Sequence, residues 1–189
     1  MCTRRRQHGI SLIELIMFIV IVSVALAGIL LVMNVTNKSS ADPLVHKQVL
    51  VISESLLEEV ELMPFTLCDP NDANAASAVV ATDCAGLDQN KAGAALITPT
   101  PSTETRYDPN FPFDNVADYG NFSMPAGAIM DVTNNNIGLA GYRADIAINL
   151  GALSGLPADA ALRITVTVTG PDNLPVVLEG IRTRYAPNP

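Results

Sequence analysis

The chain has 189 residues, of which 49% are apolar and 16% are charged, and its formal net charge is −8. A mean hydropathy of +0.30 excludes an intrinsically disordered chain, and the acidic balance leaves no basic excess that would hold nucleic acid or anionic lipid by bulk charge. An apolar average beside an acidic total suggests two different pieces joined in one chain.

A long apolar run lies near the N-terminus. Residues 15–33 carry no charge and are interrupted only by Ser23 and Gly28. At about 1.5 Å rise per residue, a helix of this length covers roughly 28 Å, which is close to the hydrocarbon core of a bilayer. Three arginines at positions 4–6 precede the run. Because basic residues stay in the cytoplasm, we expect the C-terminal body on the other side of the membrane.

A single carboxylate, Glu14, lies at the cytoplasmic edge of this run, where a functional role is the default hypothesis. It stands in the string RRRQHGISLIELI, which contains Gly9 and Ile10. This string resembles the type IV prepilin leader and N-terminal helix, in which a basic leader ends in glycine and a glutamate is fifth after the cut. The family usually has phenylalanine after the cut, where this chain has Ile10.

The resemblance implies a leader over residues 1–9 and a transmembrane and assembly helix over 10–33. A prepilin peptidase would cut between Gly9 and Ile10, and the new N-terminus would be methylated. Glu14 would pair with the new amine of a neighbouring subunit, since opposite charges in a packed-helix core cost far less together than apart. The implied partners are the peptidase, other major and minor pilins and the inner-membrane assembly machinery. The implied locations are the inner membrane before assembly, as a single-pass protein with a cytoplasmic N-terminus, and a cell-surface pilus afterwards.

An amphipathic helix is expected to continue the first over residues 34–63, with a helix start or a kink at Asp42-Pro43. Between residues 45 and 63, apolar side chains recur at spacings of four and three, which predicts one buried stripe. The stripe comprises Val45, Val49, Ile52, Leu56, Val60 and Met63. The opposite face carries Lys47, Glu54, Glu58 and Glu61, either as a solvated face or as partners for basic residues of a neighbouring subunit. His46 is expected at the surface.

A head over residues 64–189 should follow, and it begins with a long surface loop over 65–105 that has no sustained period. Two stretches, 69–72 and 113–122, carry oxygen ligands but fit no calcium-loop pattern, so we predict neither a metal site nor a cofactor. The aromatic side chains of 113–122 should dock on the core together with Val116. Asp114, Asn115 and Asp118 can make Asx-type turns.

The leader explains the odd number of cysteines. Cys2 lies in the leader, so the mature chain keeps Cys68 and Cys84. Both would be extracytoplasmic, where a disulfide is the expected state. Closing this loop would contribute about 3 kcal/mol in the chain-entropy model.

The strand signal is strongest near the C-terminus. Residues 142–150 and 162–169 alternate between apolar and polar, 176–185 form a third run, and turn residues fill 170–173. These runs predict an antiparallel β-meander over 141–185 whose apolar face the amphipathic helix covers. This α+β plan matches the type IV pilin fold.

Three arginines lie on these final strands: Arg163, Arg182 and Arg184. The last two share one face by parity. They could form a small patch for an anionic ligand or a partner, or simply a solvated face.

The body strings CDP, FDNVADY, GYRADIAI and LEGIRTRYAPN resemble MSHA-type minor pilins, MshD-like or PilV-like. The sequence has no glycine-rich phosphate loop, HExxH motif or nucleophile elbow, so no enzymatic activity is predicted. The expected function is that of a structural or initiation subunit of an MSHA-like pilus, acting in pilus biogenesis and surface attachment. A type II secretion pseudopilin and an adhesive pilus-tip subunit are the alternatives.

Overall fold

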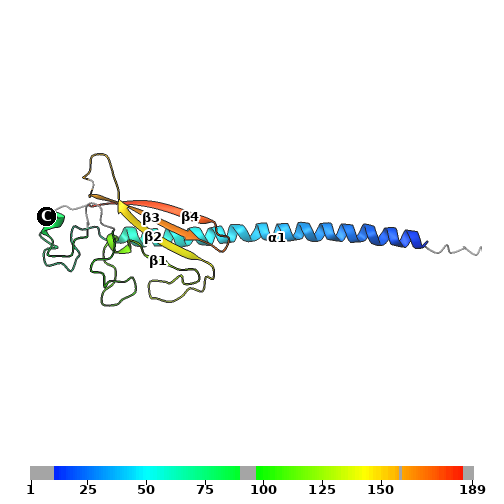
Figure 1. The fold of residues 1–189 in the computed structure, drawn as a ribbon, viewed down its shortest axis with the longest axis horizontal. Coiled ribbons are helices and arrows are strands. Elements are labelled where there is room, and N and C mark those ends of the chain that lie inside the picture. The colour runs from blue at the N-terminus through cyan, green and yellow to red at the C-terminus, as the bar shows by residue number, and fades with distance from the viewer. Residues whose placement is uncertain (1–10, 90–96, 158, 185–189) are drawn as a thin grey trace, which may run out of the picture. The chain divides into compact units, whose positions relative to one another are not determined.

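The computed structural model describes residues 11–89, 97–157 and 159–184, and for residues 35–42 the backbone alone. A long helix, α1 (Leu12–Leu62), is followed by two short 3-10 helices, η1 (Ala81–Asp83) and η2 (Val116–Tyr119) (Figure 1). The strands are β1 (Ser123–Met124), β2 (Arg143–Leu150), β3 (Ala161–Thr169) and β4 (Pro175–Thr183). The chain divides into two compact units, of which the first ends at Leu44 and the second begins at Val45.

Helix α1 runs without interruption through the position where a start was expected. Its backbone is helical from Leu12, and the Ser11 carbonyl accepts hydrogen bonds from Glu14 N (3.0 Å) and Leu15 N (3.1 Å). Pro43 lies inside the helix. Of the two expectations for Asp42-Pro43, a helix start is therefore wrong: α1 continues through Pro43, although an interior proline removes a backbone hydrogen bond and crowds the preceding turn.

The last turns of α1 supply part of the core of the second unit. The predicted stripe is confirmed, since Val49, Leu56 and Val60 are buried, and Val45, Ile52 and Met63 are partly buried against the core. His46, Lys47, Glu54 and Glu58 are exposed, and Glu61 is partly exposed. The compact unit that contains the head begins at Val45, because these helical side chains pack with the head.

The predicted meander is confirmed as an antiparallel sheet in the order β1-β2-β3-β4. Its registers run from Arg143↔Thr169 to Leu150↔Leu162 between β2 and β3, and from Ala161↔Thr183 to Thr169↔Pro175 between β3 and β4. The turn predicted at residues 170–173 joins the last two strands: Asn173 has φ 60°, and its N–H donates to the Gly170 carbonyl at 3.0 Å. Strand β1 was not predicted.

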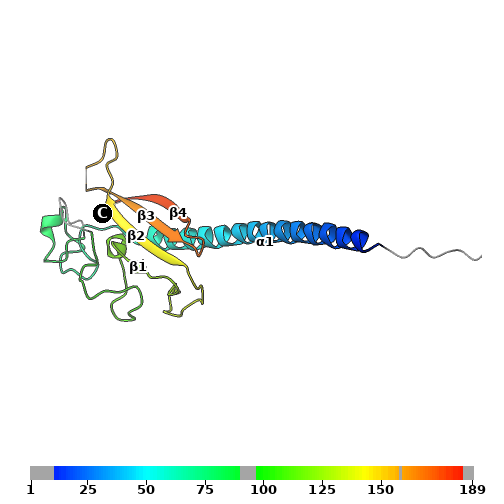
Figure 2. The ribbon, with the colours of Figure 1, turned by 45° about the vertical axis from the view of Figure 1, so that its right-hand side comes forward.

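The core lies between the sheet and the part of α1 that follows Leu44. Both views of the ribbon show this part of the helix beside β2, β3 and β4 (Figures 1 and 2). Gly180 permits a close approach, since a Cβ there would lie 3.0 Å from Leu57 Cδ1 and against the Glu61 carboxylate. The buried strand side chains that face the helix share one parity in each strand; they are Ala144, Ile146, Ile148, Leu162, Ile164, Val166 and Val168.

The segment after α1 is only in part the surface loop that the sequence predicts. It buries Phe65 and Ile97, and with them the polar residues Asp69, Asp72 and Gln89. Apart from η1 it contains no helix or extended strand among its described residues, and 90–96 lie outside them. The polar residues are buried because the chain folds back on itself and supplies their hydrogen-bond partners.

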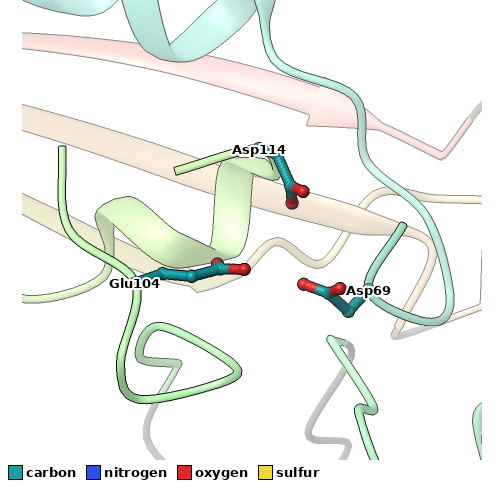
Figure 3. Close-up of side chains that lie close together, drawn as sticks. All are labelled: Asp69, Glu104 and Asp114. Atoms are coloured by element: carbon teal, nitrogen blue, oxygen red, sulfur yellow. The ribbon is translucent and has the colours of Figure 1, made fainter. Parts of the chain in front are cut away.

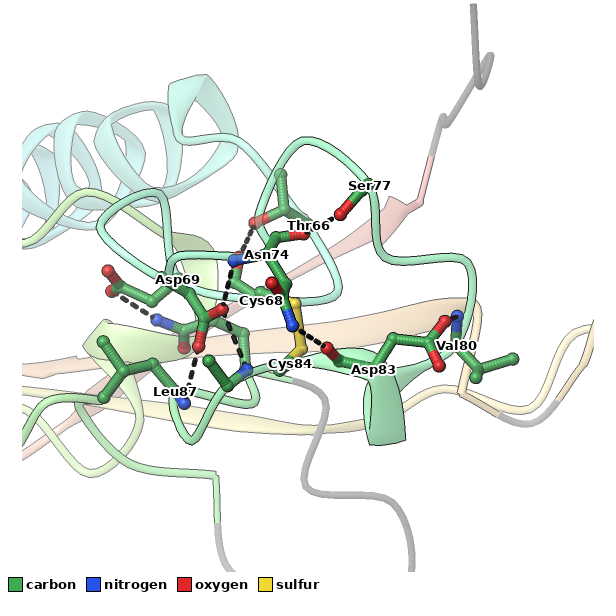
Figure 4. Close-up of a disulfide and its surroundings, with 12 residues drawn as sticks. Thr66, Cys68, Asp69, Asn74, Ser77, Val80, Asp83, Cys84 and Leu87 are labelled. Atoms are coloured by element: carbon green, nitrogen blue, oxygen red, sulfur yellow. Dashed lines mark hydrogen bonds between the residues drawn. A yellow bond between two sulfur atoms is a disulfide. The ribbon is translucent and has the colours of Figure 1, made fainter.

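The predicted disulfide between Cys68 and Cys84 is present, with an S–S distance of 2.02 Å and a Cα–Cα distance of 5.5 Å (Figure 4). Asp72 lies inside the loop that it closes. Its carboxylate accepts hydrogen bonds from the backbone N–H groups of Asn74 (2.8 Å), Ala85 (2.9 Å) and Leu87 (2.9 Å). The disulfide closes the loop, and the Asp72 carboxylate also ties it to the segment that follows Cys84.

Candidate functional site

The N-terminal part of α1 is a candidate membrane span. It comprises Leu12–Asn34, 23 residues that the structure describes in full, and none of them is buried within the chain. Length and composition suffice to cross a membrane, although a signal sequence near an N-terminus meets the same criteria. Ser23 satisfies its hydroxyl internally by donating to the Ile19 carbonyl at 2.7 Å, which lowers its cost in an apolar medium.

Glu14 lies in the first turn of α1 and is exposed. The unpaired N–H groups of a helix N-terminus favour a negative charge at this position. Gly9 and Ile10, the predicted processing residues, lie outside the described residues. The described part of the motif is thus a carboxylate at the start of an apolar helix, available to a group from outside the chain.

Comparison with known protein families gives a match that lies in this segment. Residues 4–30 match the model of the prokaryotic N-terminal methylation motif. The matched segment contains Gly9, Ile10 and Glu14 together with most of the candidate span. The comparisons with curated proteins and with solved structures give no match.

The motif and the architecture together define the class. A methylation motif that leads into a long apolar helix, followed by an antiparallel four-stranded sheet, is the arrangement of a type IV pilin-like α+β fold. The N-terminal segment is therefore similar to that of type IV prepilins. The motif implies processing by a prepilin peptidase and assembly with other pilins.

The arginines of the final strands do not form the single patch considered above. Arg163 stands opposite Ile181 on the exposed face of the sheet, where it lies 3.8 Å from Glu179. Arg182 stands opposite the buried Leu162, so Arg182 and Arg184 lie on the face that meets α1. The prediction that Arg182 and Arg184 share a face is confirmed. Arg163 lies on the other face, because its partner Ile181 is next to Arg182 in β4, and successive residues of a strand point to opposite sides.

Arg184 is also not part of a solvated face, since its side chain is only 10% exposed. Its Nη2 donates to the Asp159 carbonyl at 2.9 Å, and its guanidinium lies 4.7 Å from the centre of the Phe65 ring. Burial lowers its pKa, while the charge of Asp159 opposes that shift. These contacts give Arg184 a structural role at the end of the sheet.

A buried ion pair that the sequence analysis missed links α1 to the loops. Arg106 donates from Nε to Glu59 Oε1 and from Nη2 to Glu59 Oε2, both at 2.6 Å. Tyr119 donates to the same Glu59 Oε1 at 2.8 Å. Burial disfavours the charged form of Arg106, but the hydrogen bonds and the charge of Glu59 outweigh this effect and raise the pKa of Arg106. Burial and the charge of Glu59 raise the pKa of Tyr119.

A signal for Glu59 was present in the sequence. It lies three residues after Leu56 and four before Met63, so helical spacing places it on the apolar stripe rather than on the acidic face. A carboxylate at such a position needs a buried partner. Arg106 could not be identified from the sequence, because it comes from a loop without a period.

The structure also brings together carboxylates that lie far apart in the sequence. One oxygen each from Asp69, Glu104 and Asp114 lie within 4.8 Å of one another (Figure 3). Burial, together with repulsion from Asp118 and the other acids, raises the pKa of Glu104 to about 8. Burial and repulsion from Asp69 raise the pKa of Asp114 to about 6.

The neighbouring turns explain part of this arrangement. Asn115 Oδ1 accepts from Ala117 N at 3.2 Å, so the predicted Asx-type turn is confirmed for Asn115. Asp118 Oδ2 instead accepts from Asn115 N, three residues before it, at 2.7 Å, and so completes a capping box at the start of η2. Asp114 makes no such turn; its Oδ2 accepts from Asn71 Nδ2 at 3.2 Å. The docking of Val116 and the aromatic side chains is also confirmed, with the Phe113 and Tyr119 rings 5.0 Å apart.

Proposed function

We propose that this chain is a minor pilin of an MSHA-type pilus, a structural or initiation subunit that acts in pilus biogenesis and surface attachment. One observation carries the proposal: the methylation motif at residues 4–30 overlaps the apolar span Leu12–Asn34, in which no side chain is buried. Such a helix needs lipid or other apolar helices around it. The resemblance of the body strings to MSHA-type minor pilins supports the finer assignment.

In the proposed pathway the chain spans the inner membrane once, with arginines 4–6 in the cytoplasm and the head outside. A disulfide between Cys68 and Cys84 fits an oxidising compartment. After cleavage and methylation at Ile10, Glu14 pairs with the N-terminal amine of a neighbouring subunit and sets the axial register. We propose no catalytic activity for the head, and its acidic charge supports no bulk binding of nucleic acid.

The processing step is tested by the intact mass of the protein purified from its own membranes. We expect a chain that starts at Ile10 and carries one added methyl group. A Gly9→Glu variant should keep its leader, whereas a Gly28→Ala variant, within α1, should be processed normally. A mature N-terminus at any other residue would overturn the prepilin assignment.

The role of Glu14 is tested by its incorporation into sheared pili. The Glu14→Ala variant should be processed but largely absent from the pilus fraction, because the amine of its neighbour would be left unpaired in an apolar core. Ser23→Ala, about two and a half turns away in the same helix, should be incorporated like the wild type. Equal pilus content for both variants would remove the register role.

A type II secretion pseudopilin is the second candidate, because such proteins share the leader that the family match covers. Deleting the gene distinguishes the two functions. Loss of surface pili with normal secretion supports the minor pilin, and loss of secretion with normal pili supports the pseudopilin. An adhesive head stays a prediction. Of the arginines considered for it, Arg184 is largely buried and Arg163 lies on the face opposite to Arg182.

A further inference from the structure

Three acidic side chains from separate segments converge in the head. Asp69 directly follows Cys68, the first cysteine of the disulfide. Glu104 lies in the irregular segment between η1 and η2, and Asp114 lies two residues before η2. Figure 3 shows the carboxylates of Glu104 and Asp69 pointing toward each other, with that of Asp114 turned toward the same space. Glu104 is 3% exposed and Asp69 is fully buried.

The second observation is that several oxygens at this place have no hydrogen-bond partner. Among the described residues, Glu104 Oε2 and Asp114 Oδ1 are buried and accept no hydrogen bond. The wholly buried Gln89 donates from Nε2 to Asp69 Oδ2 (3.0 Å) and to the Thr100 carbonyl (2.8 Å), and its own Oε1 is also without a partner. Buried oxygens without partners are costly, and a cation bound among them would satisfy them.

We propose that Asp69, Glu104 and Asp114 bind a calcium ion. The cluster offers only oxygen atoms, which calcium and other hard cations prefer, and neither the nitrogen nor the sulfur that zinc and copper favour. Calcium–oxygen distances of 2.3–2.6 Å place two ligands of one ion at most about 5 Å apart. The three carboxylate oxygens, which lie within 4.8 Å of one another, satisfy this condition.

Magnesium fits the site less well than calcium. It requires near-ideal octahedral geometry and usually keeps several water ligands. Asp69 and Glu104 are almost completely buried and come from irregular loops, which leaves little room for water and imposes no regular geometry. A bound calcium ion would add a further link between three segments, one of which, at Asp69, belongs to the disulfide-closed loop.

The test uses the full chain in detergent micelles, stripped with EGTA and then studied at neutral pH by thermal unfolding. Calcium chloride at about 10 mM lies above the range of dissociation constants of extracellular calcium modules, about 0.1–1 mM. It should raise the unfolding midpoint by about 5 °C, the shift expected of a ligand well above its dissociation constant. Magnesium chloride at the same concentration should raise it much less, and an equal effect of both salts, or none of calcium, would overturn the proposal.

The Glu104→Gln variant identifies the site. It preserves the shape of the side chain, and it should abolish the calcium-induced shift while keeping or raising the midpoint in EGTA, because mutual repulsion of the acids is reduced. Glu54→Gln, a matched change on the exposed face of α1, should keep the full shift. Isothermal titration of both variants gives a second readout: persistent calcium binding by Glu104→Gln, or its loss in Glu54→Gln, would contradict the assignment.

Discussion

Glu59 and Arg106 show how one polar pair can fix the position of a loop on a helix. The side chains are 15% and 5% exposed, so both charges are largely removed from water. Such a pair is costly to bury, but its two parallel hydrogen bonds and the hydroxyl of Tyr119 satisfy the carboxylate. The pair thus specifies which loop lies against α1 more than it adds net stability.

Replacing Glu59 with Leu should lower the free energy of unfolding by about 3–5 kcal/mol, because Arg106 would remain as a buried charge without a partner. The measurement is chemical denaturation followed by circular dichroism. Glu54→Leu, on the exposed face of the same helix, should change stability by no more than about 0.5 kcal/mol. The double variant E59L/R106M should recover much of the loss, and failure to recover would show that the unpaired charge is not the cause.

The carboxylate of Asp72 should make the stability of the disulfide-closed loop depend on pH. Backbone hydrogen bonds, first from Ala85 and then from Asn74, lower its pKa. A lowered pKa in the folded state means that the stabilisation is complete above the unfolded pKa of about 3.9 and is lost as the pH falls through the folded value. Asp72→Asn should therefore be less stable than the wild type at pH 7, and denaturation midpoints should converge toward pH 3. A difference that stays constant with pH would contradict this role.

At the scale of the elements, the Cys68–Cys84 disulfide supports a segment that has almost no regular structure. The two cysteines are 16 positions apart, and closing a loop of that length restricts the unfolded chain by about 3 kcal/mol. Reduction, or the double change C68S/C84S, should lower the free energy of unfolding by about this amount. Denaturation with and without reductant measures it. The double variant should show no response to reductant, and a response there would assign the effect to something other than this bond.

The elements with a clear period are those that could be predicted from the sequence. The stripe of α1 and the alternation of β2 and β3 place Val49, Ile146 and Ile164 in the core, as expected. Strand β4 is harder, because Val177 and Ile181 alternate with Val176 and Arg182 and so both faces look mixed. The register of Arg182 opposite the buried Leu162 and the packing of Gly180 against α1 show that the face of Arg182 is the covered one.

The candidate sites divide in the same way. The methylation motif is a linear string, so Gly9, Ile10 and Glu14 could be found from the sequence alone. The cluster of Asp69 and Glu104 depends on contacts between loops that are remote in the chain and have no pattern. From the sequence, Asp118 could be predicted to accept a local hydrogen bond, but its neighbours from other loops, such as Glu104, could not be predicted.

For the whole molecule, the boundary of the compact unit at Val45 has a practical consequence. Val49, Leu56 and Val60 form one side of the core, so a fragment that starts at residue 45 keeps the core intact. We expect residues 45–189 to be soluble, monomeric and cooperatively folded. A fragment of residues 64–189 exposes the apolar face of the sheet and should aggregate or lack a thermal transition. Size-exclusion chromatography and thermal unfolding of the two fragments test this, and a folded 64–189 fragment would contradict it.

Strand β4 forms one edge of the sheet, and its sequence affects how two copies of the chain can meet. An open edge can pair with a strand of another molecule and start aggregation. Here the strand begins with Pro175, which has no N–H to donate, and it carries the charges of Glu179 and Arg182. Copies crowded together should therefore meet through side chains and not by extending one another's sheets, which keeps close packing reversible.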